Sequence, residues 1–235
     1  MKTRKAFTLV EMLVVIMIIA LLAAALFPAI SSAIDAARAT AAKTKGRGIW
    51  AAIVQCNAER EPLGMPTVWP ANFGFTNKYS TDYFIYLMSD GSNPGTPVAT
   101  DVDADRVASD LKPDVLCVSG PGCVSAAKAS EFKPQNNGWS VFSVGDQHDA
   151  GAPLLVTRNV RFGSIGLDAG GQPVSTNNSS ALPIDVTPEL NVKRGVWVTR
   201  GGGTFDARKK YMMSAAQPLL SGTNSYLWVT PGPNQ

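Results

Sequence analysis

The sequence predicts an α+β protein in which one long N-terminal helix, first membrane-spanning and then extended, packs on an antiparallel β-sheet head. Three observations support this prediction: an apolar run from Phe7 to Ile30, a helix-forming segment that reaches residue 60, and short β-rich segments in the remaining chain. The 235 residues are enough for one domain and an appendage. Apolar residues make up 45% and charged residues 17%, a composition that fits neither an intrinsically disordered chain nor a coiled-coil rod.

The first six residues form a basic leader. Three of the 21 basic residues lie there, namely Lys2, Arg4 and Lys5, and the other 18 balance the 18 acidic residues. The net charge of +3 therefore belongs to the leader alone. Nucleic-acid binding would need a basic excess in the rest of the chain, so the sequence predicts no nucleic-acid site.

The segment from Phe7 to Ile30 has the length and composition of a membrane-spanning helix. Glu11 is its only charged residue, and the 19 residues that follow carry no charge. At about 1.5 Å per residue its 24 residues make a helix of about 36 Å, longer than the hydrocarbon core of about 30 Å. A secretory signal peptide cleaved at Ala23–Ala25 is the alternative, but Glu11 has no role in such a leader.

The string KAFTLVEMLVVIMIIALLAAALFP around this segment resembles the start of type IV prepilins and type II secretion pseudopilins. In that family a short basic leader precedes Phe, and Glu is the fifth residue of the mature chain. The resemblance implies that a prepilin peptidase cuts between Ala6 and Phe7 and methylates the new amino group of Phe7. Family members usually have Gly before the cut, where this chain has the similarly small Ala6.

The resemblance implies a structural subunit, not an enzyme, of a type IV pilus-like or type II secretion filament. Its expected partners are prepilin peptidase, further copies of itself, minor pilins or pseudopilins, and an inner-membrane assembly platform. The expected location is the bacterial inner membrane and then a cell-surface or periplasmic filament. The chain would cross the membrane once, with its N-terminus in the cytoplasm and its head outside, as basic residues before the span also indicate.

Two functional questions stay open at the level of the sequence. A membrane-tethered binding head, or a minor pilin that does not form a long filament, is the alternative to a filament subunit. A pilus, a pseudopilus and a DNA-uptake system are equally compatible with the N-terminal segment.

Glu11 and Pro28 are the two residues of the span with specific expected roles. The Glu11 carboxylate is expected to pair with the Phe7 ammonium of a neighbouring subunit and so to set the register of assembly. The alternative is that Glu11 snorkels or pairs within its own chain. Pro28 removes one helical hydrogen bond, so a kink or local melting is expected between Ala24 and Pro28.

The helix is expected to continue beyond the membrane and to end near residue 60. Residues 31–60 are rich in Ala, and the cluster of Pro and Gly in 61–70 stops a helix. Gly46 and Gly48 are expected to bend or weaken it. The predicted divisions are therefore a leader (1–6), an assembly helix (7–30), a helix continuation (31–60) and an extracytoplasmic head (61–235). A fragment that begins near Thr44 is expected to be soluble.

The head is expected to contain an antiparallel sheet, two short helices and a surface loop. The expected strands are Trp139–Val144, Pro153–Val160, Arg161–Ile165, Gly195–Arg200 and Ser225–Thr230. The expected helices are Thr81–Met88 and Ala104–Leu111, and the expected loop is Asp168–Ser180.

The three cysteines allow at most one disulfide within the chain. Cys117 and Cys123 bracket the sequence VSGPG, whose turn lets the chain double back, so a small disulfide loop between them is the first choice. Cys56 then remains a buried free thiol on an apolar helix face. The alternative pairs Cys56 with one of the other two cysteines and ties the helix to the head.

The sequence predicts no cofactor, and calcium binding by three aspartates is the alternative. Asp101, Asp103 and Asp105 have the spacing of calcium ligands, but Arg106 and Lys112 occupy positions where a calcium-binding EF-hand loop needs Gly and an acid. The three aspartates are therefore read as solvated loop carboxylates.

No catalytic motif is apparent in the sequence. The single histidine, His148, has Asp146 and Asp149 nearby, an arrangement that either a metal site or a general base would need. A polar loop is the simpler interpretation of these three residues.

Overall fold

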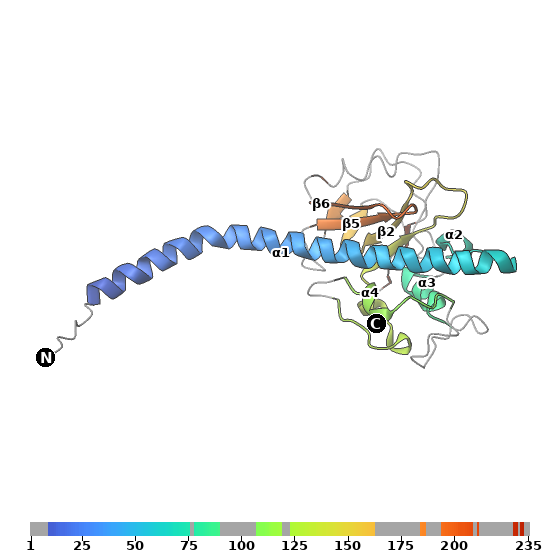
Figure 1. Cartoon of the computed structure of the whole chain (residues 1–235), viewed down its shortest axis with the longest axis horizontal. Coiled ribbons are helices and arrows are strands. Elements are labelled where there is room, and N and C mark those ends of the chain that lie inside the picture. The colour runs from blue at the N-terminus through green and yellow to red at the C-terminus, as the bar shows by residue number, and fades with distance from the viewer. Residues whose placement is uncertain are drawn as a thin grey trace. The chain divides into compact units, whose positions relative to one another are not determined.

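The computed structural model describes residues 9–75, 78–89, 107–118, 123–162, 184–186, 194–208, 211, 228–229 and 231–232. The chain divides into two compact units, Met1–Ala37 and Arg38–Gln235 (Figure 1). In the first unit the described residues all belong to helix α1 (Leu9–Arg60), which continues into the second unit. The second unit holds every described strand.

Helix α1 has 52 residues, which confirms the long N-terminal helix that the sequence predicts. Its buried residues begin at Ala39 and recur every three or four residues up to Asn57, so one stripe of the helix faces the head. The helix ends at Arg60 and is followed by a 3-10 turn, η1 (Glu61–Leu63). Gly64 then reverses the chain with a φ of 66°, in the left-handed region that favours Gly.

The second unit is built around a five-stranded antiparallel sheet in the order β6-β5-β2-β1-β7. Val156 of β2 lies opposite Trp197 of β5 and next to Ser140 of β1, so β2 is the centre of the sheet. A separate two-stranded sheet joins β3 to β4. The strands are β1 (Trp139–Phe142), β2 (Pro153–Thr157), β3 (Val160–Phe162), β4 (Ile184–Val186), β5 (Arg194–Thr199), β6 (Thr204–Arg208) and β7 (Trp228–Val229).

Residues 38–60 of α1 lie across a face of the five-stranded sheet (Figure 1), and the helix packs closely on the sheet at Gly46. A Cβ atom at Gly46 would lie 2.6 Å from Cγ2 of Val198 on β5 and 2.7 Å from the ring of Trp139 on β1. A Cβ atom at Gly48 would meet nothing within 4 Å. Gly46 therefore has a packing role, whereas Gly48 lies on the exposed side of the helix.

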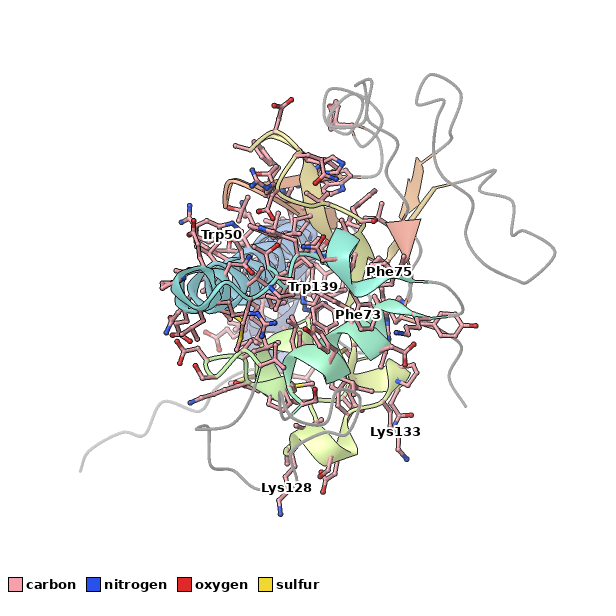
Figure 2. The ribbon with its side chains drawn as sticks, turned by 90° about the vertical axis from the view of Figure 1, so that its right-hand side faces the viewer. Trp50, Phe73, Phe75, Lys128, Lys133 and Trp139 are labelled. Atoms are coloured by element: carbon pink, nitrogen blue, oxygen red, sulfur yellow. The ribbon has the colours of Figure 1, made fainter. Side chains whose placement is uncertain are left out.

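A cluster of aromatic rings fills the space beside β1, between α2 (Pro70–Phe73) and α3 (Ser80–Leu87). The ring of Phe73 lies 5.2 Å from that of Phe75 and 5.5 Å from that of Tyr83, both in edge-to-face geometry. Phe75, Tyr83 and Trp139 are buried, and Phe73 is partly buried and packs against this core (Figure 2). These rings, with the apolar strands, form one continuous core in the second unit.

Several expected elements are confirmed with slightly different bounds. The expected segments Trp139–Val144, Pro153–Val160 and Ser225–Thr230 contain β1, β2 and β7. Strands β3 and β5 each begin one residue before the segments expected at Arg161–Ile165 and Gly195–Arg200, and α3 begins one residue before the helix expected at Thr81–Met88. The sequence did not predict β4, β6, α2, α4 (Pro113–Leu116), or the 3-10 turns η3 (Ala129–Glu131) and η4 (Pro134–Asn136).

The helix expected at Ala104–Leu111 is wrong over its described part, because Val107–Asp110 forms a turn. The amide of Val107 donates to the carbonyl of Ser89, and the amide of Ala108 donates to the carbonyl of Leu87. These two hydrogen bonds satisfy carbonyl groups at the C-terminal end of α3, which have no partner within the helix. The loop expected at Asp168–Ser180 lies outside the described residues.

Candidate assembly segment and its attachment to the head

The N-terminal part of α1 is an apolar helix whose described side chains, from Leu9 to Ile30, are all exposed. Leu9 is 81% exposed and Phe27 is 76% exposed. Removing one such side chain from water contributes about 1.5–3 kcal/mol of favourable free energy. Covering the whole segment would therefore contribute tens of kcal/mol. This helix is long and apolar enough to cross a membrane, by its length and composition.

The residues expected to act in processing and assembly lie at the start of this segment. Ala6 and Phe7 lie outside the described residues, while Glu11 lies in the first turn of α1 and is exposed. A carboxylate in the first turn interacts favourably with the helix dipole. Helix α1 continues through Pro28, so the alternative of local melting is not observed and the kink stays a prediction.

Lys43 connects α1 to the edge of the sheet through Asp206 on β6. Its Nζ lies 2.6 Å from Oδ1 of Asp206, while Arg194 of β5 donates to the other carboxylate oxygen. Partial burial of Asp206 raises its pKa, but the hydrogen bonds from Lys43 and Arg194 outweigh this effect. The pKa of Asp206 therefore lies below its usual value, and the group stays ionised between its two cations.

Trp50 makes a second connection between α1 and the sheet. Its Nε1 donates to the carbonyl of Arg200, 2.7 Å away, in the turn between β5 and β6. In the same turn Gly202 has a φ of 80°, and a Cβ atom there would lie 2.9 Å from the Trp50 ring. Arg200 in turn places its guanidinium 5.1 Å from the ring centre of Trp69.

Lys45 makes a third connection, to the segment that follows α4. Its Nζ donates to the carbonyl of Cys117 at 2.8 Å and to that of Asp114 at 3.0 Å. The sequence analysis did not identify Lys43, Lys45 or Trp50 as contact residues. In the sequence, Lys43 is next to Ala42, Lys45 is next to Gly46 and Trp50 is next to Ile49, and these three neighbours are buried. That position beside the buried stripe is the signal that could have identified them.

The three cysteines are free thiols in the structure and occupy two environments. Cys56 on α1 is buried and donates to the carbonyl of Val107 at 2.8 Å, and burial raises its pKa to about 11. The Cys117 thiol donates to the carbonyl of Val118 at 3.7 Å, and the Cys123 thiol donates to the carbonyl of Asn136 at 3.3 Å. The disulfide between these two residues stays a prediction.

His148 takes part in the hydrogen bonding of the loop between β1 and β2. Its Nδ1 accepts from the amide of Gly145 at 3.0 Å, and its carbonyl accepts from Arg200 at 2.9 Å. Asp146 accepts from Thr67 at 2.7 Å and lies 3.7 Å from Arg200. The contacts of His148 and Asp146 thus hold the loop against neighbouring segments.

No group of three His, Cys, Asp or Glu side chains that could hold a metal occurs among the described residues. Asp101, Asp103 and Asp105, the three calcium candidates, lie outside that part of the chain.

Comparison with known families matches the start of the chain. The model of the prokaryotic N-terminal methylation motif matches residues 1–27. Neither the curated proteins nor the solved structures give a significant match to the chain. The matched residues contain the basic leader, Ala6, Phe7 and Glu11. The chain therefore carries the prepilin-type cleavage and methylation segment of type IV pilins and pseudopilins.

Proposed function

We propose that this chain is a structural subunit of a type IV pilus-like or type II secretion filament and that it assembles through residues 7–30. The observation that carries the proposal is the exposed apolar helix from Leu9 to Ile30. Most of this helix lies within the methylation motif, which matches residues 1–27. A helix without a polar face needs either lipid or other apolar helices around it. Lipid would cover it in the subunit before assembly, and the same segments of other subunits would cover it in the filament.

Processing would create the second component of the assembly site. A prepilin peptidase would cut between Ala6 and Phe7 and methylate the Phe7 amino group, which stays a cation. Glu11 would then lie four residues from the new terminus, about 6 Å along the helix axis. A carboxylate and an ammonium in an apolar bundle stabilise one another only when they are paired.

Pairing between subunits would give the polymer its register. The Phe7 ammonium of one subunit would meet the Glu11 carboxylate of its neighbour, and any other axial offset would leave both charges unpaired. Breaking a buried ion pair by removing one partner costs about 3–5 kcal/mol. Apolar contacts between helices are non-directional, so this charge pair would select one offset among many of similar packing energy.

The arrangement in the cell follows from the same segment. The basic leader would remain in the cytoplasm until it is cleaved, and the head would lie outside the inner membrane. The partners would be the prepilin peptidase, the assembly platform, further copies of this chain, and minor pilins or pseudopilins. In this proposal the predicted divisions at residues 6, 30 and 60 separate the leader, the assembly helix, its continuation and the head.

The test compares filament yield in a sheared fraction with membrane-bound subunit from the same cells. We expect the Glu11→Ala chain to be cleaved and to accumulate in the membrane, but to form few or no filaments. Asp35→Ala, which removes a carboxylate from α1 outside residues 7–30, serves as the matched control and should assemble normally.

Two results would contradict the proposal. Wild-type filament yield from the Glu11→Ala chain would show that charge pairing does not set the register. A wild-type chain that is cleaved and abundant in the membrane, but absent from the sheared fraction, would favour the membrane-tethered binding head.

A further inference from the structure

The corner of the head where α1 meets β5 and β6 carries an excess of positive charge. Lys43 of α1 lies 2.6 Å from one oxygen of Asp206, and Arg194 of β5 donates to the other oxygen. Arg208 lies directly opposite Arg194 in the pairing of β5 with β6. Like charges at opposite positions of two strands destabilise a sheet. The single carboxylate of Asp206 therefore leaves this corner with net positive charge.

Arg47 extends this positive surface along α1. It is exposed and follows Lys43 by about one helical turn. Lys43 contacts β6, and Trp50 contacts the turn between β5 and β6. Residues at positions i, i+4 and i+7 share one side of a helix, so Arg47 lies on this side too. We call Lys43, Arg47, Arg194 and Arg208 the basic corner.

The C-terminal end of α1 carries exposed carboxylates and an exposed apolar surface. Residues 61–66, which follow the helix, are all exposed. Among them Leu63 is 68% exposed and Met65 is 49% exposed. Glu59 and Glu61 are exposed as well. We call Glu59, Glu61, Leu63 and Met65 the tip.

Hydrogen bonds fix the backbone of the tip. The amide of Gly64 donates to the carbonyl of Glu61 at 3.0 Å, and the amide of Met65 donates to the carbonyl of Arg60 at 3.1 Å. Nε of Arg60 donates to the carbonyl of Pro66 at 2.8 Å, so this cation is used within the turn. A surface that is ordered before it meets a partner loses less conformational entropy on binding.

We propose that the tip of one subunit binds the basic corner of another copy of this chain, and that this contact joins the heads in the filament. The inference rests on the proposed assembly through residues 7–30, which brings copies of α1 together in parallel. Arg47 and Glu61 are 14 residues apart in the sequence, about 21 Å along a helix. A copy displaced by this length places its Arg47 beside Glu61 of its neighbour.

Charge and apolar surface both favour this pairing. Glu59 and Glu61 bring negative charge to a corner whose cations outnumber its one carboxylate. Leu63 and Met65 pack against the methylene chains of Lys and Arg, which cover apolar surface while their charged ends stay in water. Because the tip and the basic corner are different surfaces, every subunit uses both, and the contact repeats without closing into a ring. An open polymer of this kind is a filament.

The first test exchanges charges in the full-length chain and measures filament yield together with membrane-bound subunit. Glu61→Arg and Arg47→Glu should each lower the yield by about fivefold or more, because like charges would then meet between copies. The chain with both substitutions has opposite charges again and should recover most of the wild-type yield. Glu131→Arg, which reverses an exposed carboxylate on η3, is the control and should assemble normally.

The apolar part of the tip is tested with two exposed side chains of the head. Leu63→Ser should lower the filament yield, because Leu63 leaves water when the contact forms. Val124 is 65% exposed and lies on a different segment, so Val124→Ser should leave the yield unchanged. Equal effects of the two substitutions would show that Leu63 makes no specific contact.

A zero-length cross-link identifies the contact directly. In filaments of the Arg47→Lys chain, a water-soluble carbodiimide should join the new amine to the carboxylate of Glu61 through an amide bond. The tryptic peptide Glu61–Lys78 would then be attached to the peptide that contains position 47. Within one chain the two positions are too far apart for this bond, so unassembled subunit from the membrane should not give it. The substitution keeps the positive charge, so this measurement does not require a disruptive variant.

Three results would overturn the contact while filaments still form. They are wild-type yield from either charge reversal, no recovery in the chain with both substitutions, and cross-links from position 47 to acids of another copy other than Glu59 and Glu61. Each of these would leave the proposed assembly through residues 7–30 intact. Absence of filaments from the wild-type chain would instead contradict the proposed function, and this inference with it.

Discussion

Lys43 on α1 and Asp206 on β6 are 163 residues apart in the sequence, yet their Nζ and Oδ1 atoms lie 2.6 Å apart. The Asp206 side chain is 15% exposed, and Arg194 donates to its other oxygen. One carboxylate therefore joins the long helix, an interior strand and an edge strand of the sheet.

Replacing Asp206 by Asn should lower the free energy of unfolding by about 1–3 kcal/mol at neutral pH, because two cations lose their partner. The pKa of Asp206 is lowered in the folded state, so its contribution is complete above the unfolded pKa of about 3.9. That contribution is lost as the pH falls through the folded pKa. Urea unfolding between pH 3 and pH 7 should show the two chains converging at the acidic end.

Asp149→Asn is the control for this measurement, since Asp149 is an exposed carboxylate. It should change stability little at any of these pH values. A constant difference between wild type and Asp206→Asn across the whole range would contradict the lowered pKa.

Two glycines of the same helix should respond in opposite ways to replacement by Ala. Gly48→Ala should stabilise the protein by about 1 kcal/mol, because Ala is the better helix former and nothing lies near the new methyl group. Gly46→Ala should destabilise it by about 1–3 kcal/mol, because the methyl group would overlap Trp139 and Val198. Thermal unfolding of both variants checks the prediction, and equal effects would show that the helix does not pack at Gly46.

The start of the soluble head is expected at Arg38 and not near Thr44. The second unit begins at Arg38, and Ala39, Ala42 and Lys43 all contact the head. A fragment of residues 38–235 should therefore unfold at a higher temperature than one of residues 44–235. Size-exclusion chromatography and thermal unfolding of the two fragments make the comparison. Identical melting temperatures would mean that residues 38–43 contribute nothing to the stability of the head.

Processing of the leader should depend on the size of residue 6. Under co-expression with a prepilin peptidase, the wild type and Ala6→Gly should both yield a mature chain that starts at Phe7. Ala6→Leu should remain uncleaved, because its side chain is too bulky for the position before the cut. Mass spectrometry of the intact chain reads the terminus directly. A terminus at residues 24–26 would instead identify an ordinary secretory signal peptide.

The expectations that rest on local composition agree with the structure. The apolar run and the Ala-rich segment produce α1, and the Pro and Gly cluster ends it at Arg60. The β-rich segments around Trp139, Leu155 and Trp197 are strands of one antiparallel sheet. The candidate assembly segment was recognised in the same way, because a charge-free run with one carboxylate is visible in a single stretch of sequence.

The expectations that failed depend on contacts between distant segments. Over its described part, the helix expected at Ala104–Leu111 is a turn whose amides at Val107 and Ala108 donate to carbonyls at the end of α3. Strand β6 begins directly after a glycine-rich turn, and only its pairing with β5 marks it as a strand. Neither feature leaves a signal in the surrounding residues.

The sequence by itself determined the long helix, its apolar first half, the place of Glu11, the end at Arg60 and the β-rich character of the head. Each of these depends on residues within a few turns of one another, where propensity and periodicity act. The tertiary structure alone decided which glycine of α1 meets the sheet and which lysine pairs with Asp206. Those outcomes depend on which surfaces come together across the fold. Gly46 and Gly48 differ in their roles only because Trp139 and Val198 lie beside Gly46.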